Sequence, residues 1–354
     1  MSRFFSTKYS ALQPYVPGEQ PRDRSYIKLN TNESPFSPSP KARKYAAEAC
    51  KNLQLYSDPE CTVIREKMAQ LYGLQPDQIF FGNGSDEALY LAFLAFCDAQ
   101  TPAIFPDITY GFYKVFAQFL GIPYSQVPLK EDFTIGVEDY LGVNKTVFIA
   151  NPNAPTGQLL TLPQIERILK ANPDNVVVID EAYIDFGGES AVKLIDDYDN
   201  LLVTQTFSKS RSLAGGRLGM AFGNAALIRD LRTAKYSINP YNVNSMTMAA
   251  GLGALEDEAY TRKNCHAIVN NREFTTRELM KLGFAVLPSC ANFVLAGHPE
   301  IPGETLYSKL KQKGILVRYF DSPRLKPYVR ITIGTIQEME LLLAAVSAIL
   351  EERV

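Results

Sequence analysis

Metal-binding side chains are scarce in this sequence of 354 residues. It has two histidines, and its five cysteines (positions 50, 61, 97, 265 and 290) are scattered without a CxxC pair. A structural zinc site needs about four such ligands at short, characteristic spacings, so we expect no metal site. Isolated cysteines are typical of free thiols in a reducing compartment, and we therefore expect a cytoplasmic protein.

Long apolar runs and an excess of charge are also missing. The longest apolar run, ALYLAFLAFC at 88–97, is too short to cross a bilayer and indicates a buried helix. The N-terminal stretch MSRFFSTKYSALQPY lacks the apolar core of a signal peptide. The net charge is −2, without blocks of like charge. These features argue against a nucleic acid or a membrane as partner and favour small-molecule substrates.

Alternating patterns in the first two thirds of the chain predict an α/β fold. Runs rich in Val and Ile, without polar alternation, indicate strands buried on both faces of a mostly parallel sheet flanked by helices. The chain also exceeds the roughly 250–300 residues at which one core stops growing, which predicts two domains. The expected strands are 78–83, 102–105, 146–151, 175–180, 200–208 and 219–223, and the expected helices are 40–52, 60–72, 86–97, 110–120 and 162–171.

The remainder has a different pattern and predicts a smaller α+β domain. Residues 224–283 are mostly helical, and short strand-like runs follow at 284–289, 292–297, 315–320 and 328–334, with helices near 303–313 and 336–352. We expect a large domain over 29–255 and a small domain over 256–354. Residues 1–28 are expected to form an irregular arm that belongs to the small domain.

Polar motifs follow several of the expected strands, where ligands of parallel α/β sheets bind. In GNGSDEAL (82–89) a glycine turn leads into a helix, and the amides around Gly84, Ser85 and Asp86 would hold a phosphate. An ordinary glycine turn with a capping Ser or Asp would have the same sequence. NPNAPTG (151–157) indicates a turn whose asparagine could point into the cleft.

Two further strand ends carry an acid and a lysine. Asp180 ends an apolar run, where a carboxylate needs a partner such as a cationic ring nitrogen, and Tyr183 adds a phenol nearby. A helix-capping aspartate is the alternative for Asp180. In TQTFSKSRSLAGGRLG (204–219), the amine of Lys209 can form a Schiff base with a carbonyl.

Residues around this lysine suit a phosphate. Thr206, Ser208 and Arg217 can bind a phosphate dianion, and Arg217 can do so through its forked guanidinium. A phosphate cradle, an acid at one strand end and a lysine at another together predict pyridoxal 5′-phosphate as cofactor, because the acid would keep the pyridine nitrogen protonated and the ring could then accept electrons.

The motifs together resemble a known family. NPNAPTG, DEAY and SKSRSLAGGRLG, in that order, are similar to those of fold-type I aminotransferases that use pyridoxal phosphate, and within them the chain most resembles the histidinol-phosphate aminotransferases. The resemblance runs from residue 12 to residue 335. Its further motifs are LQPY (12–15), LNTNESP (29–35), LYSDPE (55–60), GNGSDEAL, PDITYGFY (106–113), LVR (316–318) and YVRITIGT (328–335).

The resemblance implies a role for each site residue. Lys209 would bind the cofactor aldehyde, Asp180 its ring nitrogen and Tyr183 its ring hydroxyl, while Tyr110 would stack on the ring unless it is simply a core aromatic. The implied phosphate ligands are Gly84, Ser85, Asp86, Thr206, Ser208 and Arg217, with Tyr56 reaching across a homodimer interface. The implied substrate contacts are Tyr15, Asn32, Arg318 and Arg330, unless one arginine makes a structural ion pair.

One position departs from the family pattern. The family usually has Asn immediately before PTG, as a second ligand of the ring hydroxyl, and this chain has Ala154 there. Either Asn153 takes the role through a local shift, or Tyr183 works with less help.

The resemblance implies transamination between histidinol phosphate and 2-oxoglutarate, in histidine biosynthesis. An aromatic amino-acid aminotransferase and a threonine-phosphate decarboxylase remain alternatives, since they share the cofactor residues. A cofactor-sensing regulator would need an added DNA-binding domain, for which this chain has no spare length or basic region.

Overall fold

A seven-stranded sheet forms the centre of the larger part of the molecule. In the computed structural model, which describes residues 2–9, 12 and 14–352, the strands lie in the order β2-β8-β7-β6-β5-β3-β4. Strand β8 runs antiparallel to β2 and β7, and the other pairs are parallel. The bounds are β2 Ile79–Gly82, β3 Ala103–Pro106, β4 Tyr124–Val127, β5 Thr146–Ala150, β6 Val177–Asp180, β7 Leu201–Thr206 and β8 Gly219–Gly223. The mostly parallel sheet is confirmed, although β4 was not among the expected strands.

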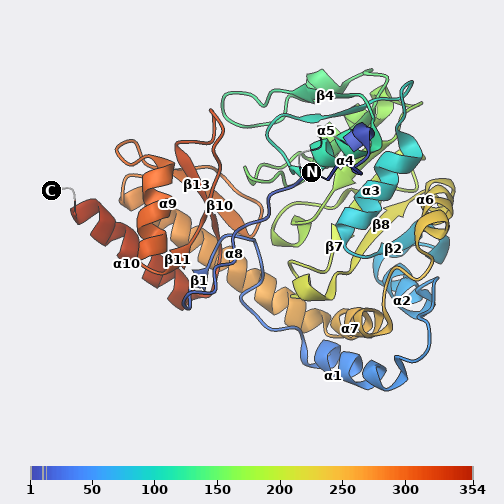
Figure 1. Cartoon of the computed structure of the whole chain (residues 1–354), viewed down its shortest axis with the longest axis horizontal. Helices are drawn as coiled ribbons and strands as arrows, with labels where there is room; N and C mark the ends of the chain where they lie inside the picture. The colour runs from blue at the N-terminus through green and yellow to red at the C-terminus, as the bar shows by residue number, and fades with distance from the viewer. Residues whose placement is uncertain (1, 10–11, 13, 353–354) are drawn as a thin grey trace.

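Both faces of this sheet are buried. On β6, Val177 and Ile179 pack into one apolar cluster, and Val178 packs into another on the opposite face. The helices that cover the two faces are α3 Ser85–Phe96, α4 Phe112–Leu120 and α6 Ala225–Ile238 on one, and α2 Thr62–Tyr72, α5 Leu162–Ala171 and α7 Ser245–Glu256 on the other, with α1 Pro40–Ala49 packed on α7 (Figure 1). Burial on both faces explains why these strands lack polar alternation.

A smaller antiparallel sheet forms the centre of the other part of the molecule, with its strands in the order β12-β13-β10-β9. Helices pack around it over a separate apolar cluster. The bounds are β9 Ala285–Val286, β10 Phe293–Gly297, β12 Arg318–Tyr319 and β13 Tyr328–Thr332 for the strands, and α8 Glu258–Lys281, α9 Gly303–Gln312 and α10 Ile336–Glu351 for the helices. The expected α+β character of this region is confirmed.

The expected strand over 315–320 is wrong in one respect. The run divides into β11 (Ile315–Leu316) and β12, which belong to different sheets. Strand β11 pairs in parallel with β1 (Ile27–Lys28), whereas β12 pairs with β13. Because β12 pairs with β13, Arg318 lies opposite Arg330 on the smaller sheet.

The N-terminal segment connects the two parts of the molecule. It starts beside α4, where Tyr9 stacks on Phe119 with ring centroids 5.1 Å apart, and crosses to β1, which pairs with β11, before the chain returns to α1 (Figure 1). Gln13 of the LQPY motif lies outside the described residues. The expected domain division at 28/29 and 255/256 stays a prediction. No helix within 2–9, 12 and 14–352 is both long and apolar enough to cross a membrane.

Candidate active site

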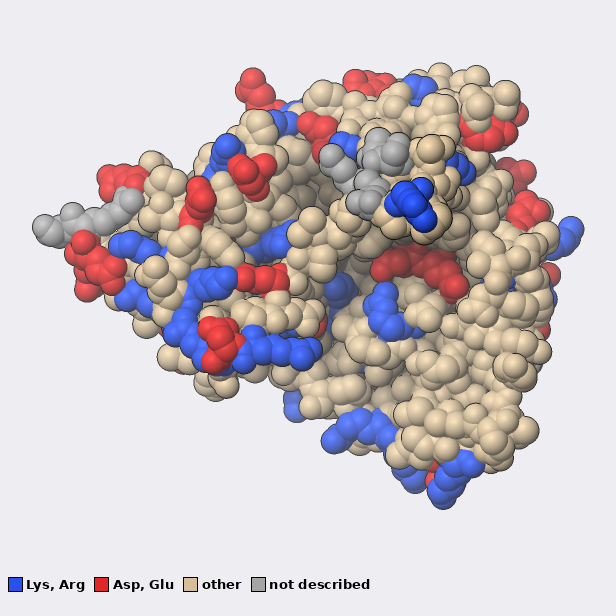
Figure 2. All heavy atoms as spheres, viewed as in Figure 1, with Lys and Arg blue, Asp and Glu red and all other residues tan. Residues whose placement is uncertain are grey.

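Two adjoining cavities meet at Lys209. The first, the sheet-end cavity, has a volume of about 390 Å³ and lies at the carboxyl ends of the parallel strands. The second, the arginine cavity, has a volume of about 660 Å³ and lies towards the smaller sheet. Both are lined by Thr31, Tyr110, Ala154, Tyr183 and Lys209. Figure 2 shows the hollow in the middle of this face, with basic side chains in blue in and beside it.

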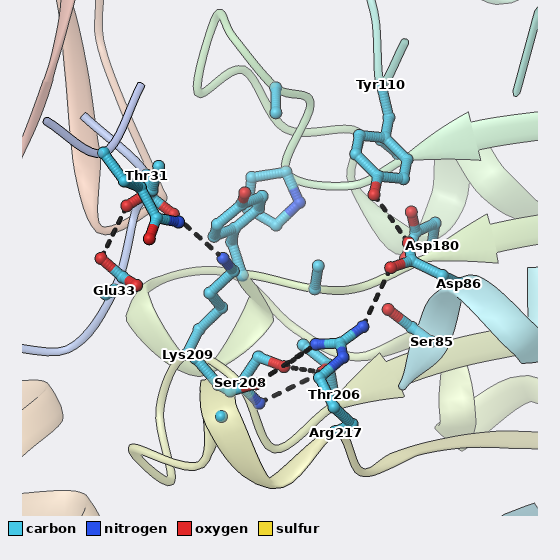
Figure 3. Close-up of a pocket in the computed structure, with 18 residues that line it drawn as sticks. Thr31, Glu33, Ser85, Asp86, Tyr110, Asp180, Thr206, Ser208, Lys209 and Arg217 are labelled. Carbon is cyan, nitrogen blue, oxygen red and sulfur yellow. Dashed lines mark hydrogen bonds and ion pairs between the residues drawn. The ribbon is translucent and has the colours of Figure 1, made fainter. Parts of the chain in front are cut away.

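Lys209 follows β7 and extends into the middle of the sheet-end cavity (Figure 3). Its Nζ donates a hydrogen bond to the carbonyl oxygen of Thr31 at 3.3 Å. Burial, followed by the charge of Arg330, lowers the pKa of this amine to about 8, although Glu33 acts in the opposite direction. A fraction of the amine is therefore neutral near pH 7, which a nucleophilic or basic lysine requires.

Asp180 closes β6 with its carboxylate facing the same cavity and is 4% exposed. Its oxygens accept hydrogen bonds from Tyr113 Oη at 2.8 Å and from Thr204 Oγ1 at 2.9 Å. Burial raises the pKa of Asp180 to about 6, and the two hydroxyl donors limit that rise. No cation within the described ranges pairs with it, so this carboxylate can accept a cationic nitrogen from a ligand.

The start of α3 and the guanidinium of Arg217 form an anion-binding corner. Helix α3 begins at Ser85 after Gly84, whose φ of 80° is unfavourable for other residues. A Cβ at Gly84 would lie 2.5 Å from Arg217 Nη2, so glycine also makes room for the guanidinium. Arg217 pairs with Asp86 at 3.1 Å. Helix N-termini bind anions through free amides and the helix dipole.

Hydroxyl groups complete this corner. Thr206 Oγ1 donates to Ser208 Oγ at 2.9 Å, and Arg217 Nη1 lies 3.5 Å from Ser208 Oγ (Figure 3). Tyr110 lies across the cavity and donates its Oη to Asp86 at 2.6 Å. The residues expected around a phosphate are thus close together in space.

Two arginines face each other across strands β12 and β13. Arg318 and Arg330 are register partners, and both line the arginine cavity. Arg318 donates to main-chain carbonyls, Arg330 Nη2 donates to Asn30 O at 2.9 Å, and Arg330 Nε has no hydrogen-bond partner. Burial, together with Arg318, lowers the pKa of Arg330. Neither arginine forms an ion pair in the described part of the chain, so the pair can bind an anion from a ligand.

Tyr15 and Asn32 border the same cavity. Tyr15 is 38% exposed, and its ring stacks on Phe112 with centroids 4.4 Å apart. Asn32 is 1% exposed, and its Nδ2 donates to Tyr183 Oη at 3.0 Å. Tyr15 is thus at the rim, whereas Asn32 is bound to another site residue.

The structure does not bring Asn153 or Tyr56 into either cavity. Asn153 is fully buried, and its amide bonds Thr109, Ile108 and Thr156, which leaves it turned away from the position of Ala154. The expectation that Asn153 shifts into the role of the missing asparagine is therefore not met in this structure. Tyr56 is 83% exposed and stacks on Tyr241, with ring centroids 4.5 Å apart.

Several residues of the site were not predicted from the sequence. Thr31 accepts from Lys209, Glu33 lies beside it, and Tyr113 and Thr204 bind Asp180. Thr204 is the register partner of Asp180 on the neighbouring strand, and a sequence that predicts two parallel strands does not give their register. No sequence pattern marked Tyr113 either, since a buried tyrosine in a helix is indistinguishable from any core aromatic.

Comparison with known proteins agrees with this geometry. The family model "Aminotransferase class I and II" matches residues 24–346. Histidinol-phosphate aminotransferases of Marinomonas sp. and Brachyspira hyodysenteriae are 51% and 49% identical to the chain over 353 residues, covering 99% of this chain and 100% of each relative. The crystal structure of histidinol-phosphate aminotransferase from Sinorhizobium meliloti in complex with pyridoxal 5′-phosphate is similar with a TM-score of 0.85 at 25% identity, covering 94% of this chain and 92% of that one. The chain therefore has the fold-type I architecture and belongs to the aminotransferase class I and II family.

Proposed function

We propose that the chain is a pyridoxal-phosphate-dependent aminotransferase that exchanges an amino group between histidinol phosphate and 2-oxoglutarate. The names of the full-length relatives support the substrate, and the cofactor complex of the S. meliloti enzyme supports the cofactor. The observation that carries the proposal is the pair of facing arginines, Arg318 and Arg330, in a cavity that opens onto Lys209.

The sheet-end cavity fits the cofactor. It offers an amine with a lowered pKa at Lys209, a buried carboxylate without a cation at Asp180, and an anion-binding corner at Arg217 and Ser85. These three groups match the aldehyde, the pyridine nitrogen and the phosphate of pyridoxal phosphate. When bound, this cofactor supplies an aldehyde for the amines and an electron sink for the substrate's Cα–H bond.

The protein side chains would then hold and move protons. Asp180, ionised and desolvated, would keep the ring nitrogen protonated, and Tyr113 and Thr204 would hold its carboxylate in place. Lys209 Nζ would take the proton from the substrate's Cα, since it is buried and its pKa of about 8 is close to neutral pH. Tyr110 would cover the ring face, and Tyr183 would bind the ring hydroxyl.

The arginine cavity would bind two different anions in turn. Histidinol phosphate presents a phosphate, and glutamate presents a carboxylate, at the far end from the amino group. Guanidinium binds either anion through two parallel hydrogen bonds, so Arg318 and Arg330 can serve both half-reactions. Tyr15, stacked at the rim, would close the cavity over either substrate.

A panel of amino donors tests this assignment. We expect histidinol phosphate with 2-oxoglutarate to give the highest kcat/KM, and histidinol without its phosphate to be slower by about 10²-fold or more, the loss of a charge-assisted anion contact. Phenylalanine as the best donor would instead indicate an aromatic aminotransferase. Release of CO₂ from threonine phosphate would indicate a decarboxylase. Either outcome refutes the proposed substrate.

We also propose a cytoplasmic homodimer. Apolar side chains are exposed around Tyr56, among them Leu53, Leu55 and Tyr241, and all five cysteines are free thiols. In a dimer, Tyr56 would reach the phosphate of the cofactor in the partner subunit. Sedimentation at micromolar concentration should give twice the chain mass, and Tyr56→Phe should weaken cofactor binding without changing that mass. A monomeric active enzyme would contradict the dimer.

A further inference from the structure

The phenol of Tyr183 is held by an asparagine from a distant part of the chain. Asn32 Nδ2 donates to Tyr183 Oη at 3.0 Å. A phenol oxygen has one proton to donate and lone pairs to accept with. Since this oxygen already accepts from Asn32, the Tyr183 proton is free to be donated elsewhere. Tyr183 lines both cavities, so the proton can be donated into the site.

Thr332 determines which way the Asn32 amide is turned. The main-chain N–H of Asn32 donates to Thr332 Oγ1 at 3.0 Å, and Thr332 Oγ1 donates to Asn32 Oδ1 at 3.0 Å. The reversed amide would leave the hydroxyl proton of Thr332, which is 2% exposed, without this acceptor. The arrangement therefore directs the NH₂ group of Asn32 towards Tyr183.

The backbone of Asn32 is equally well fixed. Its φ of 56° lies in the left-handed region, which asparagine tolerates better than most residues. Its carbonyl oxygen accepts from Asn292 Nδ2 at 3.0 Å. An asparagine buried to 1% exposure in such a conformation has little freedom to turn towards a substrate, although its side chain borders the arginine cavity.

Apolar side chains also pack against the ring of Tyr183. Ala154, Ala291 and Phe293 form a small cluster against which Tyr183 packs, and the Phe293 ring meets the Tyr183 ring edge-on, with centroids 5.1 Å apart. Ala154 lines both cavities but has no polar atom in its side chain. The neighbouring amide, that of Asn153, is engaged with Thr109, Ile108 and Thr156.

We infer that Asn32 is a positioning residue that commits the proton of Tyr183 to the ring hydroxyl oxygen of the bound cofactor, where position 154 supplies no amide donor. The inference rests on the proposed use of pyridoxal phosphate. It gives Asn32 a different task from the substrate contact that its motif suggested. Asn32 acts through Tyr183, and Thr332 acts through Asn32.

The test uses the visible absorption of the cofactor joined to Lys209. A hydrogen bond to the ring oxygen stabilises its negative charge and weakens its hold on the proton of the neighbouring nitrogen. Losing that bond should raise the pKa of this nitrogen by about one unit, a tenfold shift in the protonation equilibrium. The titration reports on the bound cofactor without any turnover.

Two substitutions separate the hydrogen bond from other effects. Asn32→Asp keeps the shape but accepts the Tyr183 proton instead of donating to the phenol, and Asn32→Gly removes the side chain in a backbone conformation that glycine adopts freely. Both should raise the titration pKa, and Asn32→Asp should do so more strongly. Thr332→Ser, which keeps the hydroxyl, is the matched control and should leave the pKa unchanged.

Repeating both substitutions in a Tyr183→Phe background completes the cycle. If Asn32 acts through the phenol, Asn32→Gly should not shift the titration there by more than about 0.3 unit, a small fraction of the single-background effect, and Asn32→Asp should keep only the part of its shift that its own charge causes. Equal shifts in both backgrounds, or no shift in the wild-type background, would overturn the inference. Thermal melts of each variant identify one that does not fold, and the other variant then decides. A wild-type chain that binds no cofactor at Lys209 would instead refute the proposed function, and the inference with it.

Discussion

The two cavities that meet at Lys209 differ in whether their charged side chains have partners within the protein. In the sheet-end cavity, Arg217 pairs with Asp86, and Asp180 receives two hydroxyl donors. In the arginine cavity, Arg318 and Arg330 face each other, and neither forms an ion pair with a carboxylate of the described residues. The first cavity is held together by internal contacts, whereas the second keeps two cations without an ion-pair partner among the described residues.

This difference suits a resident cofactor and a passing substrate. A group that stays bound benefits from ligands held in place beforehand, because little ordering remains to be done on binding. A substrate that must leave after each half-reaction benefits from a site whose charges are satisfied only while it is present. The like-charge pair would cost stability in the empty site and favour either anion when it arrives.

The largest effect should come from the residue that both cavities share. Lys209→Ala should lower kcat by at least about 10⁴-fold, since it removes both the covalent anchor and the base. Lys209→Arg is the control, because it keeps a cation but has no amine of usable pKa, and it should be equally inactive. Borohydride reduction followed by peptide mass analysis should find the cofactor on Lys209 in the wild-type chain. A cofactor attached to another lysine would contradict the assignment.

In the arginine cavity, substitution of Arg330 should lower the activity strongly and the stability of the fold only slightly. Arg330→Met should lower kcat/KM for both histidinol phosphate and glutamate by about 10²-fold, because one charge-assisted anion contact is lost. The free energy of unfolding of the cofactor-free chain should change by less than about 1 kcal/mol, since the lost bond to Asn30 is offset by relief of repulsion and of the unpartnered Nε.

Urea denaturation and steady-state kinetics measure the two quantities. Arg330→Lys, which keeps the charge without the fork, should be intermediate in kcat/KM. A loss of several kcal/mol in stability together with activity would show instead that Arg330 is structural, and the contrast between the cavities would then disappear.

In the sheet-end cavity, the contacts that hold Asp180 should determine how cofactor affinity depends on pH. Tyr113→Phe removes one donor to Asp180, so the pKa of that carboxyl should rise above its value of about 6. Because a protonated Asp180 cannot pair with the cationic ring nitrogen, cofactor binding should weaken as the pH falls. For a rise of about one pKa unit, we expect about a fivefold loss of affinity at pH 6 and less than about 1.5-fold at pH 8.

Equilibrium binding at the two pH values checks this prediction. Tyr113→Phe keeps the buried ring, so a loss of packing would weaken binding equally at both. A pH-independent effect would therefore count against a role for Tyr113 in holding the ionised carboxylate.

The sequence predicted strand ends better than it predicted what surrounds them. Asp180 and Lys209 were identifiable because each carries a charge at or just beyond the end of a buried strand, where a charge without a partner is costly. Tyr113 and Thr31 were not, because a core tyrosine and a main-chain carbonyl carry no pattern of their own. The division of 315–320 between two sheets was missed for a similar reason: an apolar run indicates burial but not the partner strand.

The pattern at 151–157 indicated a turn but not the direction of each side chain. One of the two alternatives was that Asn153, beside the expected position, replaces the missing asparagine by a small shift. In the structure, Asn153 instead joins the turn to the segment at Ile108 and Thr109, whereas its neighbours Pro152, Ala154 and Pro155 line the cavities. Direction depends on tertiary contacts that no local sequence contains.

The smallest effect on function should come from that asparagine. Asn153→Ala removes a buried amide whose three partners are all protein groups, so it should lower the free energy of unfolding by about 1–3 kcal/mol. The pH titration of the bound cofactor should stay within about 0.3 unit of wild type, because the amide does not reach the sheet-end cavity. Denaturation and absorbance measure the two. If the titration moved as far as in Tyr183→Phe, Asn153 would also bind the ring hydroxyl of the cofactor. Tyr183, held by Asn32, would then not be its sole hydrogen-bond donor.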